Sequence, residues 1–280
     1  MILLTGATGN VGRPLTRLLA DANVPFRVFA RNPERARSTL GSEAEVIQGD
    51  LADPSSLETA LTGGEVLFLL NGDPALEEGA VNAAVRAGVR RVVKQSALAG
   101  GLSPPPFHRR VEERLERSGL GWTHVRPNAF MQTLLGYLPT LISDDGILRL
   151  PAGEGRVGWV DARDIAAVAF HALTEDNHEG RAYAVTGPES LSMADVAGVI
   201  SEATSRGVRY EDVPTEIARE RLLAAGLQTP FADFLVGFYA AVRAGAHEAV
   251  SGDVAEVTGR APRSFRDFAG EHADTFTGGK

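Results

Sequence analysis

The chain of 280 residues contains no cysteine, which excludes a disulfide framework, a thiolate nucleophile and a cysteine-based metal site. None of its apolar runs approaches the roughly 18 residues that a helix needs to span a bilayer. Basic residues are outnumbered by acidic ones, and the formal net charge is -8. Because nucleic-acid binding depends on neutralising phosphates, this charge argues against it. We therefore expect a cytoplasmic protein that binds neither membranes nor nucleic acid.

Several motifs of catalytic chemistry are also missing. The histidines show no metal-ligand spacing such as His-Glu-x-x-His, so no metal site is expected. Without a nucleophile-elbow motif, a Ser–His–Asp arrangement cannot be argued. The first apolar strand begins at Met1, so we expect neither a signal nor a transit peptide.

A glycine loop is the most informative motif that is present. Gly6, Gly9 and Gly12 follow the apolar run Met1–Leu4 directly and lead into an amphipathic helix pattern. Gly6 permits a sharp turn, Gly9 lets the backbone approach phosphates, and Gly12 lets the helix pack closely on the strand. The helix N-terminus adds unpaired N–H groups, so the motif predicts a dinucleotide pyrophosphate site. The residues expected to bind there are Thr5, Gly6, Thr8, Gly9, Asn10, Val11 and Gly12.

Apolar runs alternate with helical patterns through the first half of the chain. Helix starts are indicated at Asn32-Pro33 and Asp53-Pro54, where a polar cap precedes proline. This alternation predicts an α/β fold with a Rossmann-like, doubly wound parallel sheet. The expected strands are Met1–Thr5, Phe26–Ala30, Glu45–Gln48, Val66–Leu70, Val92–Gln95 and Trp122–Val125.

The pattern changes after Pro127. We expect helices over Asn128–Leu141, Asp161–Leu173 and Ser192–Ala203, the last two capped by their first residues. Strands are expected at Ile147–Leu150 and Ala182–Val185, and the chain is mostly helical from Pro214 onward. The expected division is an NAD(P)-binding Rossmann domain (1–129 plus 158–187) and a smaller, mostly helical substrate-binding lobe (130–157 plus 188–280).

The second strand ends in Arg31, with no acidic residue at its tip. Folds that prefer NAD usually place an acid there for the ribose 2′-hydroxyl, whereas arginine suits a 2′-phosphate, which it can bind bidentately. NADP(H) is therefore the expected cofactor. Arg35 and Arg37 could instead form the solvated face of the next helix, and this interpretation is favoured for Arg37.

Polar residues follow three other strands of the expected sheet. Asp50 and Leu51 end the third strand, Asn71 and Gly72 follow the fourth, and Ser96 follows the fifth. Because such sheets bind ligands outside the carboxyl ends of their strands, we expect these residues to contact the cofactor. Asn71 could equally be an ordinary polar turn residue.

These residues resemble those of a known family. The chain is similar to the NmrA-like group of atypical short-chain dehydrogenases/reductases, and within it to the quinone, azo and triphenylmethane reductases. The resemblance rests on the glycine loop and on segments that cover nearly the whole chain, among them Phe29–Pro33, Gly49–Leu51, Val92–Ala97, Arg126–Met131, Val160–Ile165 and Tyr183–Leu191. It implies the fold and a nicotinamide cofactor, and it leaves the substrate open.

The resemblance also reveals a departure. Better-known members of the superfamily carry Tyr-x-x-x-Lys on the helix after the fifth strand, where the tyrosine protonates the substrate. Here Pro104 and His108 stand at those two positions, and no tyrosine lies between Met1 and Trp122. A His-x-x-x-Glu pair occurs at this place in the reductase branch, which implies catalytic roles for His108 and Glu112.

Two interpretations of that pair remain open. His108 could hydrogen-bond the nicotinamide ribose or relay a proton, with Glu112 raising its pKa. The pair could equally be an i,i+4 contact on the helix surface. Phe107, Val111 and Leu115 are expected to form the buried stripe of this helix.

Residues after the sixth strand complete the expected site. Pro127, Asn128 and Phe130 should face the nicotinamide, although Phe130 could also belong to the core. Asp161 and Asp164 resemble a carboxylate pair for acid–base catalysis, but a helix cap explains them better.

Two functions follow from these expectations. The first is an NADPH-dependent oxidoreductase that transfers hydride to a small conjugated acceptor, such as a quinone, azo compound, enone or carbonyl. Because such acceptors delocalise the added charge, they suit a protein without the tyrosine. The alternative is a non-catalytic NADP(H)-sensing regulatory protein. The small lobe favours the enzyme, which could be a monomer or a homodimer.

Overall fold

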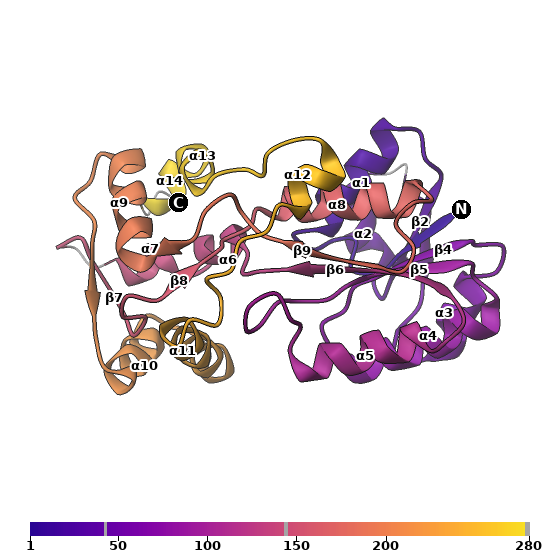
Figure 1. Cartoon of the computed structure of the whole chain (residues 1–280), viewed down its shortest axis with the longest axis horizontal. Coiled ribbons are helices and arrows are strands. Elements are labelled where there is room, and N and C mark those ends of the chain that lie inside the picture. Colours follow the sequence, from indigo (N-terminus) through magenta and orange to yellow (C-terminus); the bar gives the residue numbers. More distant parts are fainter. Residues whose placement is uncertain (42–43, 143–144, 278–280) are drawn as a thin grey trace.

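The computed structural model describes residues 1–41, 44–142 and 145–277. Figure 1 shows an elongated molecule, with a sheet and its covering helices at one end and a mostly helical part at the other. The glycine loop and the strands whose ends carry the expected cofactor residues belong to the part of the molecule that contains the sheet.

The larger part is built on a seven-stranded sheet with the order β3-β2-β1-β4-β5-β6-β9. Its strands are Ile2–Leu4 (β1), Phe26–Ala30 (β2), Val46–Gln48 (β3), Val66–Leu69 (β4), Arg91–Gln95 (β5), Gly121–Pro127 (β6) and Arg181–Val185 (β9). Neighbouring strands pair in parallel throughout. The strand order reverses between β1 and β4, and open α/β sheets bind ligands at such a point. The predicted Rossmann-like, doubly wound sheet is confirmed.

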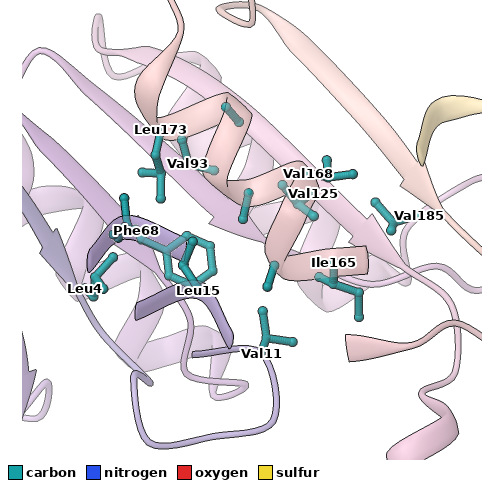
Figure 2. Packing of buried hydrophobic residues seen from close by; sticks show 14 of the residues in the cluster. Leu4, Val11, Leu15, Phe68, Val93, Val125, Ile165, Val168, Leu173 and Val185 are labelled. Atoms are coloured by element: carbon teal, nitrogen blue, oxygen red, sulfur yellow. The ribbon is translucent and has the colours of Figure 1, made fainter. Parts of the chain in front are cut away.

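Helices cover both faces of this sheet (Figure 1). One face carries α1 (Gly12–Asp21) and α8 (Ala162–Thr174), and the other carries α3 (Pro54–Ala60), α4 (Pro74–Ala87) and α5 (Pro106–Glu116), while α2 (Pro33–Leu40) packs beside β3. Successive strand side chains point to opposite faces, so Leu4 and Leu3 enter separate hydrophobic cores. Figure 2 shows the first core, in which Leu4, Phe68 and Leu15 pack with residues of α8.

Side-chain caps begin several helices where the sequence predicts them. Asn32 accepts a hydrogen bond from the Arg35 amide, and Asp53 accepts one from the Ser55 amide. Ser192 forms a reciprocal capping box with Asp195. These bonds satisfy N–H groups that a helix leaves unpaired in its first turn, and they confirm the predicted starts.

The second part has a hydrophobic core of its own, which includes Met131 and Tyr137. Two short sheets lie in it: β7 (Ile147–Leu150) pairs in parallel with β11 (Arg209–Asp212), and β8 (Arg156–Val157) pairs antiparallel with β10 (Leu191–Ser192). Its helices are α6 (Met131–Leu135), α7 (Leu138–Leu141), α9 (Met193–Thr204), α10 (Thr215–Ala224), α11 (Thr229–Arg243), α13 (Phe265–Glu271) and α14 (Ala273–Phe276). Residues 143–144 and 278–280 of the expected lobe lie outside the described residues. No helix within the described ranges has the length and apolar character to cross a membrane.

One segment of the expected small lobe lies with the sheet instead. The helix α12 (Asp253–Thr258) packs against α8 and β9, and its Val254 belongs to the core shown in Figure 2. The chain therefore returns from the second part to the sheet before it ends in α13 and α14 (Figure 1).

The expected continuous helix over Asn128–Leu141 is wrong. The Asn128 amide donates to the Val185 carbonyl, and Phe130 forms a β-bridge with Val160, so the chain stays extended beyond β6. Helix α6 then ends at Leu135, with Gly136 as its C-cap, and Pro139 stands in the first turn of α7. Proline lacks the N–H group that a continuous helix would need there, which explains the break.

Candidate cofactor-binding and active site

The glycine loop joins β1 to α1 in a conformation that requires glycine. Gly6 has φ +65°, and a Cβ atom there would lie 2.9 Å from the Leu70 side chain and carbonyl oxygen. At Gly12 a Cβ atom would lie 2.4 Å from both Ala7 Cα and the Gly6 oxygen. Gly12 thus lets α1 start directly against the loop.

The other loop residues divide by exposure. Thr8, Gly9 and Asn10 are exposed, and α1 begins without a side-chain cap. In its first turn the Arg13 amide donates to the Gly9 carbonyl, the Leu15 amide donates to the Val11 carbonyl, and Pro14 has no N–H group. The amides of the exposed Thr8 and Asn10 have no backbone partner among the described residues and are open to an anionic ligand. Thr5 and Val11 are buried. The Thr5 hydroxyl bonds across to Leu70, accepting from its amide at 2.8 Å, so this side chain fastens β1 to β4. Any contact of Thr5 or Val11 with a ligand would therefore come from the backbone.

A cavity of about 470 Å³ lies beside the loop, at the carboxyl ends of β1 to β4. It brings together many of the predicted cofactor residues, and its lining includes Thr5, Gly6, Thr8, Arg31, Asp50, Leu51 and Asn71. The predicted loop residues Gly9, Asn10, Val11 and Gly12 do not line it. Neither do the predicted residues Gly72, Ser96, His108, Pro127, Asn128 and Phe130. They follow β4, β5 and β6, further along the same sheet edge.

Two arginines stand on the wall of this cavity. Arg31 follows β2, and Arg35 lies one helical turn later on α2, where the Asn32 cap begins the helix. Both are exposed, and neither guanidinium has an acidic partner among the residues that the structure describes. Sequence reasoning left Arg35 open as a helix-face residue. The cap at Asn32 fixes where α2 begins and so puts Arg35 in its first turn, next to Arg31. This cap could have indicated from the sequence that Arg35 belongs to the site.

The loop after β4 is fixed by a buried carboxylate. Glu77 Oε1 accepts hydrogen bonds from the amides of Asn71 and Gly72, at 3.2 and 3.4 Å. Gly72 has φ +92°, a conformation that glycine adopts without strain. The Asn71 side chain is exposed in the cavity wall, whereas Ser96, after β5, is buried.

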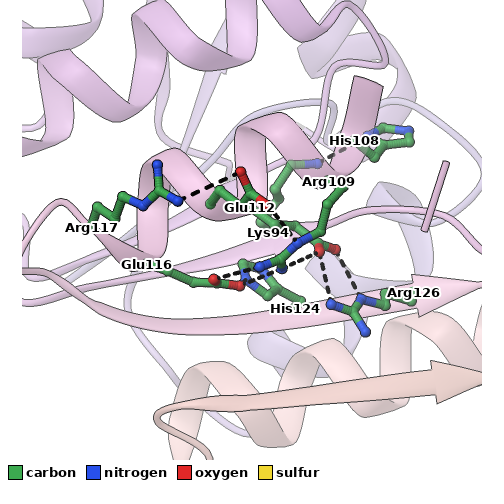
Figure 3. A network of polar contacts seen from close by, with 9 residues as sticks. Lys94, His108, Arg109, Glu112, Glu116, Arg117, His124 and Arg126 are labelled. Atoms are coloured by element: carbon green, nitrogen blue, oxygen red, sulfur yellow. Dashed lines mark hydrogen bonds and ion pairs between the residues drawn. The ribbon is translucent and has the colours of Figure 1, made fainter. Parts of the chain in front are cut away.

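His108 stands at the start of α5 beside a buried lysine that sequence reasoning missed. Its Nδ1 atom lies 3.2 Å from Lys94 Nζ, and Lys94 in turn lies 2.9 Å from Glu77 Oε2 (Figure 3 draws the histidine and the lysine). Burial, together with the positive charge of Lys94, lowers the pKa of His108 to about 4. The histidine is therefore neutral near pH 7. A lysine inside an apolar strand was the signal that could have revealed this contact.

Glu112 pairs with two arginines and does not bond to His108. Arg126 on β6 donates to its two oxygens at 2.9 and 2.8 Å, and Arg109 lies 3.2 Å from Oε2 (Figure 3). Although burial opposes ionisation, the Arg126 hydrogen bonds and neighbouring positive charge hold the Glu112 pKa at about 2. The charge of Glu112 does act to raise the His108 pKa, as expected, but burial and the charge of Lys94 outweigh it, so the net pKa is lowered.

The expected buried stripe of α5 is also partly wrong. Val111 and Leu115 are fully buried, but Phe107 is 50% exposed. His108 and Glu112 take the buried positions, so the polar pair lies on the inner face of the helix. The alternative of a surface i,i+4 pair is excluded by this burial.

Glu112, Glu116 and His124 bring one ligand atom each within 4.8 Å of the others. This cluster already has cationic partners, because Arg109 bonds to both glutamates and Arg126 to the first. Burial lowers the pKa of His124 to about 4.

The residues after β6 are held mainly by protein contacts. The Asn128 side chain donates to the His247 carbonyl at 2.9 Å and accepts from the Ala129 amide, and its oxygen also lies 3.1 Å from His247 Nδ1. Pro127 ends β6, and Phe130 is half-buried against the sheet core. The Asn128 side chain thus ties β6 to the segment after α11. Both the nitrogen and the oxygen of its amide already have protein partners.

The two aspartates of α8 are structural. Asp161 caps the helix through the Arg163 amide and pairs with the Arg163 guanidinium. Asp164 accepts from the Arg263 amide at 2.7 Å and pairs with its side chain. The favoured helix-cap interpretation is confirmed for Asp161.

Comparison with known proteins identifies the family of this chain. The profile of the NmrA-like family matches residues 1–235, and the chain belongs to this family. It is 38% identical to an NAD(P)H azoreductase from Xenophilus azovorans over 99% of both chains. It is 40% identical to a (4-alkanoyl-5-oxo-2,5-dihydrofuran-3-yl)methyl phosphate reductase from Streptomyces griseus, again over 99% of both.

A solved structure extends the comparison to a bound cofactor. An NADPH-dependent quinone oxidoreductase from Escherichia coli, crystallised with NADPH, superposes with a TM-score of 0.88 at 25% identity. The match covers 97% of this chain and 99% of that one. The resemblance to NmrA-like reductases that the sequence indicates is thereby confirmed.

Proposed function

We propose that this protein is an NADPH-dependent reductase that delivers hydride to a small conjugated acceptor of the quinone, azo or enone type. Its coarser assignment as an NAD(P)H-dependent oxidoreductase follows from its relatives, two of which are named reductases and match nearly the full chain. The observation that carries the choice of NADPH is the pair Arg31 and Arg35 on the cavity wall, both without acidic partners among the described residues.

The residues present fit a dinucleotide phosphate. The backbone of the exposed glycine loop, at the N-terminal end of α1, would hold the pyrophosphate, as the N-terminal ends of helices do for anions. Arg31 and Arg35 would hold the 2′-phosphate, because a guanidinium binds phosphate bidentately. When bound, NADPH supplies the hydride, and the protein contributes position and charge.

The protonation of His108 supports the choice of acceptor. With a pKa of about 4, the ring is neutral near pH 7 and can donate a hydrogen bond but does not carry an extra proton. Tyr137 and Tyr239 do not replace the missing tyrosine, because their hydroxyls bond to each other at 2.6 Å inside the second part and burial raises the pKa of Tyr137. An acceptor that spreads the added charge over a conjugated system reduces the need for a protein acid.

We further propose that the two parts divide the work. The Rossmann domain (1–129 plus 158–187), with α12 packed on its sheet, would bind the cofactor. The rest of the lobe (130–157 plus 188–280) would close the acceptor pocket. Within the Rossmann domain, Glu112 would be a structural residue that anchors α5 to β6 through Arg126. His108 would contact the cofactor or the acceptor.

The test is oxidation of NADPH and NADH by purified protein with a quinone, an azo dye, an enone and an aldehyde. We expect turnover with the conjugated acceptors, a preference for NADPH, and slow or no turnover with the aldehyde. Tight NADPH binding without turnover on any acceptor would refute the reductase and favour the NADP(H) sensor. A preference for NADH would refute the role given to the two arginines.

A further inference from the structure

A buried ion pair lies directly behind His108. Lys94 is on β5 in the middle of the sheet, and Glu77 is in the first turn of α4. Both side chains are 0% exposed, and Lys94 Nζ lies 2.9 Å from Glu77 Oε2. Burying two charges costs solvation that their attraction often only balances, so such a pair contributes little net stability by itself. Its contacts with neighbouring groups are therefore the place to look for its role.

Three acceptor atoms surround the Lys94 nitrogen. They are Glu77 Oε2 at 2.9 Å, the Gln95 carbonyl oxygen at 2.9 Å and His108 Nδ1 at 3.2 Å. A lysine ammonium has three N–H groups and no lone pair, so it can only donate. Paired with a carboxylate, Lys94 makes His108 Nδ1 an acceptor, and the ring proton must then reside on Nε2.

The opposite nitrogen of His108 is free to act. No hydrogen bond joins Nε2 to any residue within 1–41, 44–142 or 145–277, and the side chain keeps 10% of its surface exposed. His108 begins α5 and thus lies near the carboxyl edge of the sheet, where the cofactor is expected.

The same pair also reaches the cofactor cavity. Glu77 Oε1 receives the amides of Asn71 and Gly72, and Asn71 lines the cavity. One carboxylate therefore fixes the β4 loop through one oxygen and Lys94 through the other. A single buried network sets both the loop and the histidine.

We propose that Lys94 is a positioning residue that holds His108 in the Nε2–H form and so presents a neutral hydrogen-bond donor to the bound cofactor or acceptor. Lys94 itself stays behind the histidine and touches neither ligand. The ligand contact rests on the proposed function, whereas the form of the histidine does not. In this arrangement the lysine acts through a histidine side chain, in a chain that lacks Tyr-x-x-x-Lys.

The first test measures the protonation of Lys94 and the ring form of His108 by NMR, in the full-length wild-type protein without any acceptor. The chain has only two lysines, Lys94 and Lys280, so ¹⁵N-lysine labelling gives a spectrum in which Lys94 is readily assigned by substitution. We expect a protonated Lys94 ammonium and, in ¹⁵N-histidine spectra, an Nε2–H ring for His108 at pH 7. A neutral Lys94 amine or an Nδ1–H ring would overturn the proposal.

The second test removes the pair. The double variant Glu77→Gln with Lys94→Met deletes both charges and leaves no buried ion unpaired. We expect His108 to populate both ring forms. The Kd for NADPH should rise about tenfold or more, because the variant also weakens the hold of Glu77 on the Asn71–Gly72 loop at the cavity wall. An unchanged single Nε2–H form in this variant would refute the positioning role.

Arg91→Met is the matched control. Arg91 is another buried cation on β5, but it donates to the Glu175 and Leu173 carbonyls at the end of α8. This variant should lose stability while retaining the His108 ring form and the NADPH affinity. An equal effect of both variants on His108 would show a general loss of packing and would overturn the assignment. The ring form of His108 is measured without turnover. The positioning role of Lys94 can therefore be confirmed even if no acceptor is reduced, and it can be refuted even in an active reductase.

Discussion

Replacing Glu112 with glutamine should separate a structural carboxylate from a catalytic one. In the wild type the Glu112 side chain is 0% exposed, and Arg126 binds both of its oxygens. The fall of its pKa from an ordinary 4.5 to about 2 corresponds to about 3 kcal/mol of folding stability near neutral pH. Glu112→Gln should therefore lower the free energy of unfolding by about 3 kcal/mol at pH 7, because the Arg126 charge loses its partner.

The pH dependence gives this prediction its sign. A carboxylate with a depressed folded pKa stabilises the protein above its unfolded pKa and loses that effect as the pH falls through the folded value. The contribution of Glu112 should thus be complete above pH 4.5, fall to about half at pH 3 and disappear below pH 2. The difference between wild type and variant should narrow over the same window.

Urea unfolding at several pH values measures this difference. Trp122 stacks on His124 next to the network, with ring centroids 4.5 Å apart, so its fluorescence should report the transition. Glu113→Gln is the control, because Glu113 lies on the same helix with its side chain 40% exposed and should change stability by at most about 0.5 kcal/mol. A Glu112→Gln variant that is as stable as wild type but inactive would refute the structural role and restore the catalytic one.

Three other changes test the rest of the site. Gly12→Ala should abolish measurable NADPH binding and cost about 1–3 kcal/mol of stability, because the new Cβ would lie 2.4 Å from backbone atoms of the loop. Calorimetry would measure the binding and thermal melting the stability, and near-normal binding would contradict the loop geometry. The double variant Arg31→Ser with Arg35→Ser should reduce the preference for NADPH over NADH about tenfold or more, measured as the ratio of their Kd values. Arg37→Ser, which lies outside the cavity lining, should leave this preference unchanged. An unaltered preference in the double variant would disprove the 2′-phosphate assignment. The free energy of unfolding should decline as the pH drops from 6.5 to about 4, because the neutral, buried His124 gains a proton on unfolding. Urea unfolding at several pH values would measure this decline, and His124→Gln should make it shallower. The same slope in variant and wild type would exclude His124 as its source.

The sequence predicted local structure well wherever neighbouring residues decide it. The glycine loop and the caps at Asn32, Asp53 and Ser192 depend on a few consecutive residues, and the structure has them where expected. The parallel sheet followed from alternating patterns for the same reason.

The partners of polar side chains could not be predicted in this way. Helix periodicity placed His108 and Glu112 on one face, but it does not say which strand lies opposite each of them. Lys94 and Arg126 fill those places from β5 and β6, and their distance along the chain hid both contacts. The break in the expected Asn128–Leu141 helix has a similar cause, because Val185 and Val160 of distant segments satisfy its first residues.

The return of α12 to the sheet has a consequence for how the chain can be divided. Its Val254 completes a core built mainly from the first 185 residues, while α13 and α14 beyond it belong to the other core. A single cut between α9 and α12 would therefore leave the sheet fragment without one covering helix and the remaining fragment without α6 and β7. We expect neither fragment to fold alone, and the two parts to form by complementation only when both fragments are present together.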